Sequence, residues 1–371
     1  MNQARIYLSP PHLEPTAQQY MAEAIASNWI APVGPFITRF EKALCDYSQS
    51  PHCIAVNSGT SAIHLALIVA GVTDGDEVLC STFTFAASAF PIRYQRATPI
   101  FVECEAQGWN ICPDTLEQAI TARHKLGKHP KALIVAHCYG NPADMPRILN
   151  ICEKHNITVI EDAAEAVGSS LQGIPMGNWA SLGAYSFNGN KIITCSSGGA
   201  LLCKNDAQAK LARKIAAQAK EPVPHFEHHL EGHNFLMSNL LAAVGVSQLE
   251  VLADRVKSRR ERFDSYQEQL HKIPGCSWQH EIPGAISNRW LSTFYFSSDS
   301  TINTSDWISK LAAENIESRA LWKPLHTQVA FKDCPYYGDG LSERLYANGI
   351  CLPSGQKVNE DSVQQIFDHH V

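Results

Sequence analysis

Two carboxylates and one lysine in the middle of the chain have the residue types and spacing for amine chemistry. Glu161 and Asp162 directly follow Ile157–Ile160, an apolar, β-branched run that is typical of a fully buried parallel strand. Lys191 stands in a turn after a second strand-like run, Leu182–Phe187. Open α/β sheets bind ligands beyond the carboxyl ends of their strands, so these side chains are predicted to face a ligand.

Asp162 and Lys191 together match what pyridoxal phosphate requires of a protein. The amine forms a Schiff base with the cofactor, and the carboxylate keeps the pyridine nitrogen protonated so that the ring withdraws electrons. Each residue alone also has an ordinary explanation. Asp162 could be the N-cap of a helix over AAEAVG, and Lys191 could be a solvated turn lysine.

A second group of residues could bind an anion. Gly59, Thr60 and Ser61 lie between the predicted strand His52–Val56 and an apolar helix. Free N–H groups and the positive end of the helix dipole would point at one spot there, which suits a phosphate. A plain N-cap by Ser58 or Ser61 is the alternative. The spacing matches neither a P-loop nor GxGxxG, which argues against an NAD-dependent Rossmann enzyme.

The surrounding elements indicate an α/β fold. Strand Ala132–His137, helix Asp144–His155 and strand Ile157–Ile160 form one βαβ unit, whose crossover makes the sheet at least partly parallel. A long helix capped by Ser238 is predicted to run to about residue 270 and to lead into a smaller α+β unit. The predicted domains are residues 1–245, the larger and ligand-binding one, and residues 246–371.

Composition narrows the classes of protein. With 371 residues, 45% of them hydrophobic, and a net charge of −6, the chain is expected to be globular, without nucleic acid as its main partner. No run reaches the roughly 18 apolar residues of a membrane span, and a cytoplasmic protein is predicted. The 12 cysteines form no CxxC pair and are expected to be reduced thiols. A histidine-rich stretch lacks a metal-ligand spacing, so no metal is predicted; its histidines are His225, His228, His229 and His233.

Four segments resemble one known family, the DegT/DnrJ/EryC1/StrS family of pyridoxal phosphate-dependent sugar aminotransferases. They read NSGTSAIHLAL, STFTFAAS, EDAAEAVGS and SFNGNKIITCSSGGAL, and the similarity runs from about residue 6 to 356. The resemblance implies the fold type I architecture, with a mostly parallel seven-stranded sheet in the large domain and a smaller C-terminal α+β domain. It also implies a homodimer with shared active sites, L-glutamate as amino donor and a ping-pong mechanism.

The resemblance also assigns roles by position. Lys191 would hold pyridoxal phosphate covalently, Asp162 would contact its ring nitrogen, and Phe85 would stack on its ring. Phosphate contacts would come from Gly59, Thr60 and Ser186, with Ser61 as a further hydroxyl, and from Asn234 of the partner subunit. Glu165 takes a position near O3′ that is often glutamine, and Leu236 one that is commonly arginine.

The segments YLSPPHLEP, NWIAPVGP, SRALWKPLHTQ and NGICLPSG resemble the branch that aminates UDP-4-keto-6-deoxy-N-acetylglucosamine on the way to bacillosamine. Trp29, Trp322 and His326 are the candidates for contacts with the sugar. Two alternatives remain: a GDP-4-keto-6-deoxymannose (perosamine-type) aminotransferase, and a non-catalytic scaffold or sensor that binds the cofactor. The sugar dehydratase branch carries histidine where aminotransferases have lysine, so Lys191 argues against it.

Overall fold

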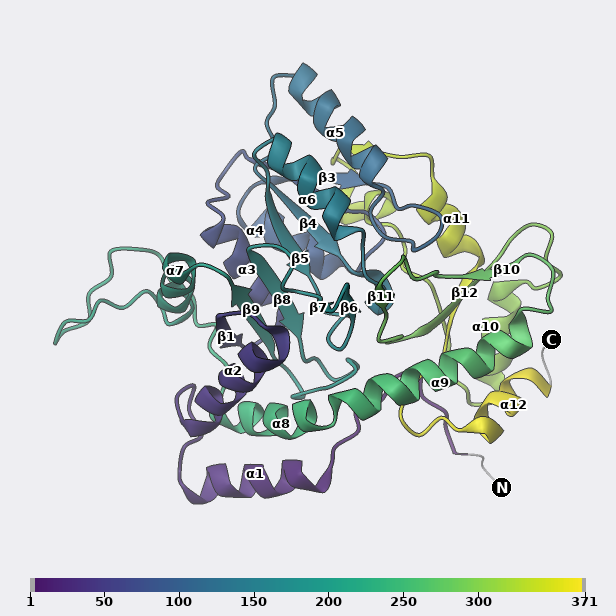
Figure 1. The fold of residues 1–371 in the computed structure, drawn as a ribbon, viewed down its shortest axis with the longest axis horizontal. Helices are drawn as coiled ribbons and strands as arrows, with labels where there is room; N and C mark the ends of the chain where they lie inside the picture. Colours follow the sequence, from purple (N-terminus) through teal and green to yellow (C-terminus); the bar gives the residue numbers. More distant parts are fainter. Residues whose placement is uncertain (1–3, 369–371) are drawn as a thin grey trace.

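A computed structural model describes residues 4–368 of the chain. Its central feature is an eight-stranded sheet in the order β1-β9-β8-β5-β4-β2-β3-β14 (Figure 1). Every strand runs in the same direction except β9, which is antiparallel to both of its neighbours. The strands are β1 (His52–Val56), β2 (Glu77–Ser81), β3 (Thr98–Val102), β4 (Ala132–Ala136), β5 (Thr158–Asp162), β8 (Leu182–Ser186), β9 (Gly199–Cys203) and β14 (Tyr336–Tyr337).

The mostly parallel α/β sheet is confirmed, and it has one strand more than the seven predicted. The additional strand, β14, comes from the C-terminal part of the chain and pairs with β3. The Tyr336 hydroxyl donates to Glu103 Oε2 at 2.6 Å, just beyond the end of β3. Two residues are too few for a hydrophobic pattern to reveal a strand, so only this long-range pairing makes β14 visible.

Helices cover both faces of the sheet, as alternation along the buried strands requires. In β4, Leu133 and Val135 belong to one apolar cluster, and Ala132 and Ile134 belong to another on the opposite face. The first face packs against α2 (Pro35–Ser48), α5 (Pro113–Lys125), α6 (Met145–Lys154) and α8 (Asn239–Glu250), with α1 (Pro15–Ala26) outside α8. The second packs against α3 (Gly59–Val69), α4 (Phe90–Tyr94) and α7 (Asp206–Ala216).

The single long helix predicted for residues 238–270 is wrong in one respect, because it consists of two helices. Ser238 caps α8 by accepting the Leu241 N–H, as predicted. The backbone of Val251 then leaves the helical region, with φ −111° and ψ 9°, and its N–H turns to the Gln248 carbonyl. Helix α9 (Leu252–Leu270) continues from α8 across the lower part of the molecule toward the C-terminal part in Figure 1.

The C-terminal part builds a second sheet that is wholly antiparallel. Its order is β10 (Cys276–Trp278), β12 (Ser292–Phe296), β15 (Gly349–Leu352) and β13 (Arg319–Ala320). Its own apolar core includes residues of α9, α10 (Thr304–Ala313) and α12 (Glu360–Asp368), and α11 (Leu341–Asn348) precedes β15. A small third sheet joins β11 (Ala285–Ile286), β6 (Ser170–Leu171) and β7 (Ile174–Pro175).

The division of the chain at residue 245 stays a prediction. In the part of the chain that is described, no helix is both long and apolar enough to cross a bilayer.

Candidate active site

A cavity of about 300 Å³ lies where β5 and β8 end and α3 begins. Strand ends and a helix start meet there because parallel strands deliver their carboxyl ends to one edge of the sheet. Most of the predicted site residues line it: Gly59, Thr60, Phe85, Asp162, Glu165, Ser186, Lys191 and Trp322. The structure thus brings together residues from five separate stretches of sequence.

Asp162 is the last residue of β5, and its carboxylate is held from two sides. Oδ2 accepts a hydrogen bond from Ser88 Oγ at 2.6 Å, and Oδ1 accepts one from the Ala164 N–H at 3.2 Å. No α-helix begins at residue 163, so the N-cap explanation for Asp162 is wrong. The carboxylate is therefore fixed in orientation where it borders the cavity.

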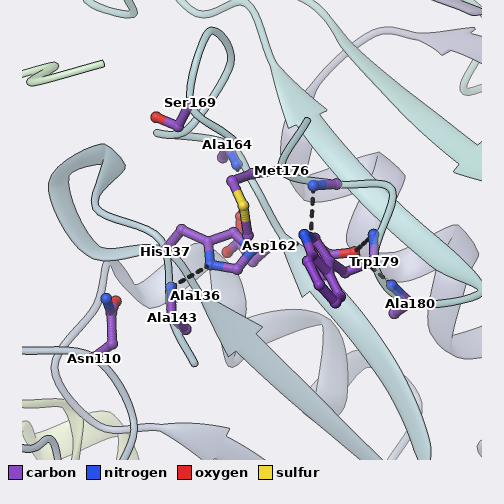
Figure 2. Close-up of polar contacts among 12 residues, drawn as sticks. Asn110, Ala136, His137, Ala143, Asp162, Ala164, Ser169, Met176, Trp179 and Ala180 are labelled. Carbon is purple, nitrogen blue, oxygen red and sulfur yellow. Dashed lines mark hydrogen bonds and ion pairs between the residues drawn. The ribbon is translucent and has the colours of Figure 1, made fainter. Parts of the chain in front are cut away.

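The neighbouring Glu161 does not line the cavity and is fully buried. Its carboxylate accepts four hydrogen bonds, one from His137 at 3.1 Å and three from backbone N–H groups. Figure 2 labels three of the donor residues, His137, Trp179 and Ala180. The backbone donors are Gly177, Trp179 and Ala180, at 2.8, 2.6 and 2.7 Å. Because all four partners are donors, Glu161 anchors the turn after β7 and has no lone pair directed at a ligand.

The hydrogen bonds of His137 identify its tautomer. Nδ1 accepts the Ala143 N–H at 3.2 Å, so Nδ1 is unprotonated and Nε2 carries the proton that goes to Glu161 (Figure 2). The ring is therefore neutral and fixed by both nitrogens. His137 lines the cavity, but both of its ring nitrogens are already hydrogen-bonded within the protein.

Lys191 is a largely enclosed lysine rather than a solvated one. Its side chain is 12% exposed, and its Nζ lies 3.7 Å from Glu165 Oε1. The same Nζ lies 4.1 Å from the centroid of the Trp290 ring. The turn that presents it is closed by the Lys191 N–H, which donates to the Asn188 carbonyl at 3.0 Å. The amine is thus placed inside the cavity, between a carboxylate and the face of an aromatic ring.

Glu165 is held by the backbone as well as by Lys191. Its Oε2 accepts the Tyr139 N–H at 2.7 Å, and Tyr139 adopts a left-handed φ of 54°. Burial raises the pKa of Glu165 above its usual value, while the Lys191 ammonium and the Tyr139 N–H oppose that change. A carboxyl in this environment takes up a proton more readily than one in water.

The start of α3 forms a cradle that requires glycine. A Cβ on Gly59 would lie 2.8 Å from Ser186 Cβ, closer than side chains approach one another. Ser58 caps the helix by accepting the Ser61 N–H at 3.0 Å, and Ser61 Oγ donates to Asn57 Oδ1 at 2.6 Å. The hydroxyl of Ser61 is therefore used inside the cap and does not line the cavity, whereas Gly59 and Thr60 do.

These residues fit pyridoxal phosphate. Lys191 supplies the amine, Asp162 supplies a carboxylate on another strand, and the N–H groups at the start of α3 suit a phosphate. The cradle beside Gly59 leaves room that any larger residue would fill.

Besides Ser61, three predicted residues lie outside the cavity. Trp29 is 47% exposed at the end of α1, and its carbonyl accepts from Asn239 Nδ2. His326 stacks on Tyr336 with ring centroids 3.7 Å apart. Asn234 borders a different hollow together with Leu236, so it does not reach Lys191 within one chain. The predicted contact from Asn234 of a partner subunit stays a prediction.

Some residues at the site carry no signal in the sequence. Ser88, which fixes Asp162, stands in a helical turn after a Thr- and Phe-rich segment, and Trp290 reads simply as the start of a buried strand. Thr84 Oγ1 contacts Ser88 Oγ at 3.1 Å and extends the same network. Only the three-dimensional arrangement identifies these residues.

The histidines of residues 225–233 and the cysteines form neither a metal site nor disulfides in the described part of the chain. His225 and His229 both contact the carboxylate of Glu227 at exposed positions. Over residues 4–368, no three His, Cys, Asp or Glu side chains are arranged to hold a metal ion. The 12 cysteines are free thiols, and most are buried.

Similarity to known proteins agrees with this site. The model of the DegT/DnrJ/EryC1/StrS aminotransferase family matches residues 11–370. EpsN of Bacillus subtilis (strain 168), named as a pyridoxal phosphate-dependent aminotransferase, is 44% identical over 98% of this chain and 94% of its own length. A GDP-perosamine synthase of Caulobacter vibrioides is 32% identical over 98% and 96%.

Solved structures share the fold. A DegT DnrJ EryC1 StrS aminotransferase from Brucella abortus has a TM-score of 0.89 and 28% identity, over 95% of this chain and 93% of that one. The PLP form of Spr1654, from Streptococcus pneumoniae, has a TM-score of 0.89 and 25% identity, over 98% and 97%. The chain therefore belongs to the DegT/DnrJ/EryC1/StrS aminotransferase family, and its cofactor is pyridoxal phosphate.

Proposed function

We propose that this aminotransferase moves the amino group of L-glutamate to a nucleotide-linked 4-keto-6-deoxy sugar, in two half-reactions of ping-pong order. The observation that carries the proposal is the presence of Lys191 and Asp162 in one cavity, on a chain that resembles sugar aminotransferases over nearly its whole length. Pyridoxal phosphate, when bound, supplies an electron sink for the carbanion that forms at Cα.

The protein's own groups would divide the work as follows. Lys191 Nζ would take the proton from Cα of the amino donor and would pass it to C4′ of the cofactor. Asp162, fixed by Ser88, accepts a hydrogen bond from the ring nitrogen and holds the proton on it. The N–H groups at the start of α3, beside Gly59, bind the phosphate. Phe85 and Trp322 line the cavity with their ring centroids 5.4 Å apart and their planes tilted by 49°, and would provide apolar surface for a ring.

A second group of assignments completes the proposal. The protein is a cytoplasmic homodimer, in which Asn234 of the partner subunit reaches the phosphate. This arrangement would explain why Asn234 lies away from Lys191 within one chain. Trp29, Trp322 and His326 contact the sugar nucleotide, of which only Trp322 lines the cavity of the single chain.

We infer UDP-4-keto-6-deoxy-N-acetylglucosamine as the acceptor, from the resemblance of the N-terminal and C-terminal segments to the bacillosamine branch. The second candidate is GDP-4-keto-6-deoxymannose, because several relatives named GDP-perosamine synthase are 30% or 32% identical to this chain. The two acceptors differ in both nucleotide and sugar, so one assay separates them.

The test is a panel of UDP-, GDP- and dTDP-linked 4-keto and 3-keto sugars with L-glutamate as donor, read by mass spectrometry. We expect the UDP-linked 4-keto acceptor to be aminated fastest, and the Lys191→Ala variant to be the inactive control. Amination of the GDP sugar alone would favour the second candidate. A protein that binds pyridoxal phosphate but returns no 2-oxoglutarate from glutamate would be a non-catalytic scaffold and would contradict the proposal.

A further inference from the structure

The turn that presents Lys191 is held by residues far from it in sequence. The carbonyl of Asn190, directly before Lys191, accepts two hydrogen bonds. One comes from Trp290 Nε1 at 2.8 Å, across 100 positions, and the other from Ser9 Oγ at 2.7 Å, across 181 positions. The peptide that precedes the reactive amine is therefore tied to both the N-terminal segment and the C-terminal part of the chain.

Trp290 is itself fixed in position. Its backbone N–H donates to Asn288 Oδ1 at 2.9 Å, and its carbonyl accepts from Arg259 Nη1 at 2.8 Å. Its ring is 1% exposed and stacks with Tyr139 and Trp322 at centroid distances of 6.4 and 6.5 Å. The indole therefore has little freedom to follow Lys191 if the lysine moves.

Arg259 supports both groups that hold Asn190. Its Nη2 donates to Ser9 Oγ at 2.9 Å while its Nη1 donates to the Trp290 carbonyl. It is buried, and no carboxylate of the described residues forms an ion pair with it. Burial, with repulsion from Arg262 and Arg255, lowers the pKa of Arg259 to about 9. Burying a guanidinium without an acidic partner is costly, so a purely packing role would be served better by an apolar side chain.

The Lys191 amine contacts both the face of the Trp290 ring and the carboxylate of Glu165. Lys191 Nζ lies 4.1 Å from the ring centroid and 3.7 Å from Glu165 Oε1. A cation over an indole face is attracted by the ring quadrupole, most strongly where water is excluded. Trp290 thus contacts two parts of this turn. Its Nε1 binds the Asn190 carbonyl, which belongs to the peptide group before Lys191, and its ring face contacts the Lys191 amine.

We propose that Trp290 is a positioning residue for Lys191, which aims the amine into the cavity by fixing the Asn190 carbonyl and by holding Nζ against its ring. The inference rests on the role of Lys191 in the proposed function and deepens it. Trp290 acts through Lys191 and need not touch the substrate. The ordinary alternative is that Trp290 only fills the core between the sheet and the C-terminal part.

The experiment uses the full-length protein freed of cofactor. Pyridoxal phosphate is added back, bound complexes are trapped with borohydride at successive times, and the fraction of modified Lys191 is measured by peptide mass spectrometry. Trp290→Leu removes both contacts, and we expect the rate of modification to fall about tenfold. Trp290→Phe keeps a ring face but loses the Nε1 donor, and we expect an intermediate rate, about threefold slower.

Trp307→Phe is the matched control. Trp307 is 2% exposed in the C-terminal core, where its ring packs against Phe296, and it does not line the cavity. We expect wild-type modification rates from this variant, and thermal unfolding shows whether each variant is folded at the assay temperature. If Trp290→Leu does not fold, Trp290→Phe carries the test.

Wild-type rates in a folded Trp290→Leu protein would overturn the positioning role. A wild-type rate in Trp290→Phe would likewise overturn the part assigned to the Asn190 carbonyl. A wild-type protein in which Lys191 is never modified would instead refute the proposed function. The two failures are therefore distinguishable, and neither readout depends on the identity of the sugar.

Discussion

Glu161 and Asp162, the adjacent carboxylates at the end of β5, should respond differently when their charge is removed. The Glu161 variant should lose mainly stability, and the Asp162 variant should lose mainly activity. Glu161→Gln keeps the shape of a buried side chain but replaces one acceptor oxygen with an NH₂ group. Four donors meet the carboxylate now, so a glutamine would leave about two of them facing an N–H group. Each buried polar group left unpaired costs about 1–3 kcal/mol, so two of them would lower the free energy of unfolding by about 2–6 kcal/mol.

Asp162→Asn removes a charge from a side chain that borders the cavity. The asparagine Oδ1 can still accept from Ser88 Oγ, and the Ala164 N–H, at 3.2 Å from the present carboxylate, can turn to water in the cavity. We therefore expect a loss of about 1–2 kcal/mol in stability. Activity should fall far more, because a neutral amide cannot keep the pyridine nitrogen protonated.

Urea unfolding of the cofactor-free variants measures the first effect, and glutamate half-reaction rates of the refilled proteins measure the second. We expect Glu161→Gln to unfold at lower urea and, where folded, to retain its rate. The reasoning would be refuted if Asp162→Asn were the less stable variant, or if it kept a wild-type rate while Glu161→Gln lost it.

Three further outcomes are expected. Lys191→Ala should lose turnover and the covalent link to pyridoxal phosphate, seen as an unmodified peptide after borohydride treatment; residual turnover would rule out its assigned role. Gly59→Ala places a Cβ 2.8 Å from Ser186 Cβ, so cofactor affinity, measured by titration, should fall about tenfold or more, at a strain of about 1–3 kcal/mol. Burial, with a smaller contribution from His233, lowers the pKa of His64 to about 4, and Gln95 Nε2 lies 2.6 Å from its Nε2. Below about pH 6.5, the His64 side chain therefore binds a proton in the unfolded chain but not in the folded one. The free energy of unfolding should fall from pH 6.5 toward pH 4 by about 1–2 kcal/mol, a value reduced because His64 is partly exposed. Denaturant unfolding of His64→Gln should show a flatter acid limb, and an unchanged slope would contradict this.

Local pattern was enough to predict the partly parallel α/β sheet and the positions of Asp162 and Lys191 at or beyond the ends of its strands. The β-branched run before Asp162, the βαβ unit and the small residues at Gly59 each act within a few residues, where apolar periodicity and turn chemistry leave a clear mark. The resemblance to a known family extended this to nearly the whole chain. The predicted helix over residues 238–270 shows the limit of such patterns, because the apolar spacing continues across Val251 although the backbone does not.

The sequence by itself determined that a lysine and an aspartate would stand at strand ends in an α/β fold, since strand direction and alternation follow from the residues alone. Only the tertiary structure decided that Ser88 fixes the Asp162 carboxylate, that the Ser61 hydroxyl is used inside a helix cap, and that Trp290 and Ser9 hold the turn before Lys191. These contacts join residues separated by up to 181 positions. They depend on how helices and strands that are distant in sequence pack together, and no local sequence pattern encodes this packing.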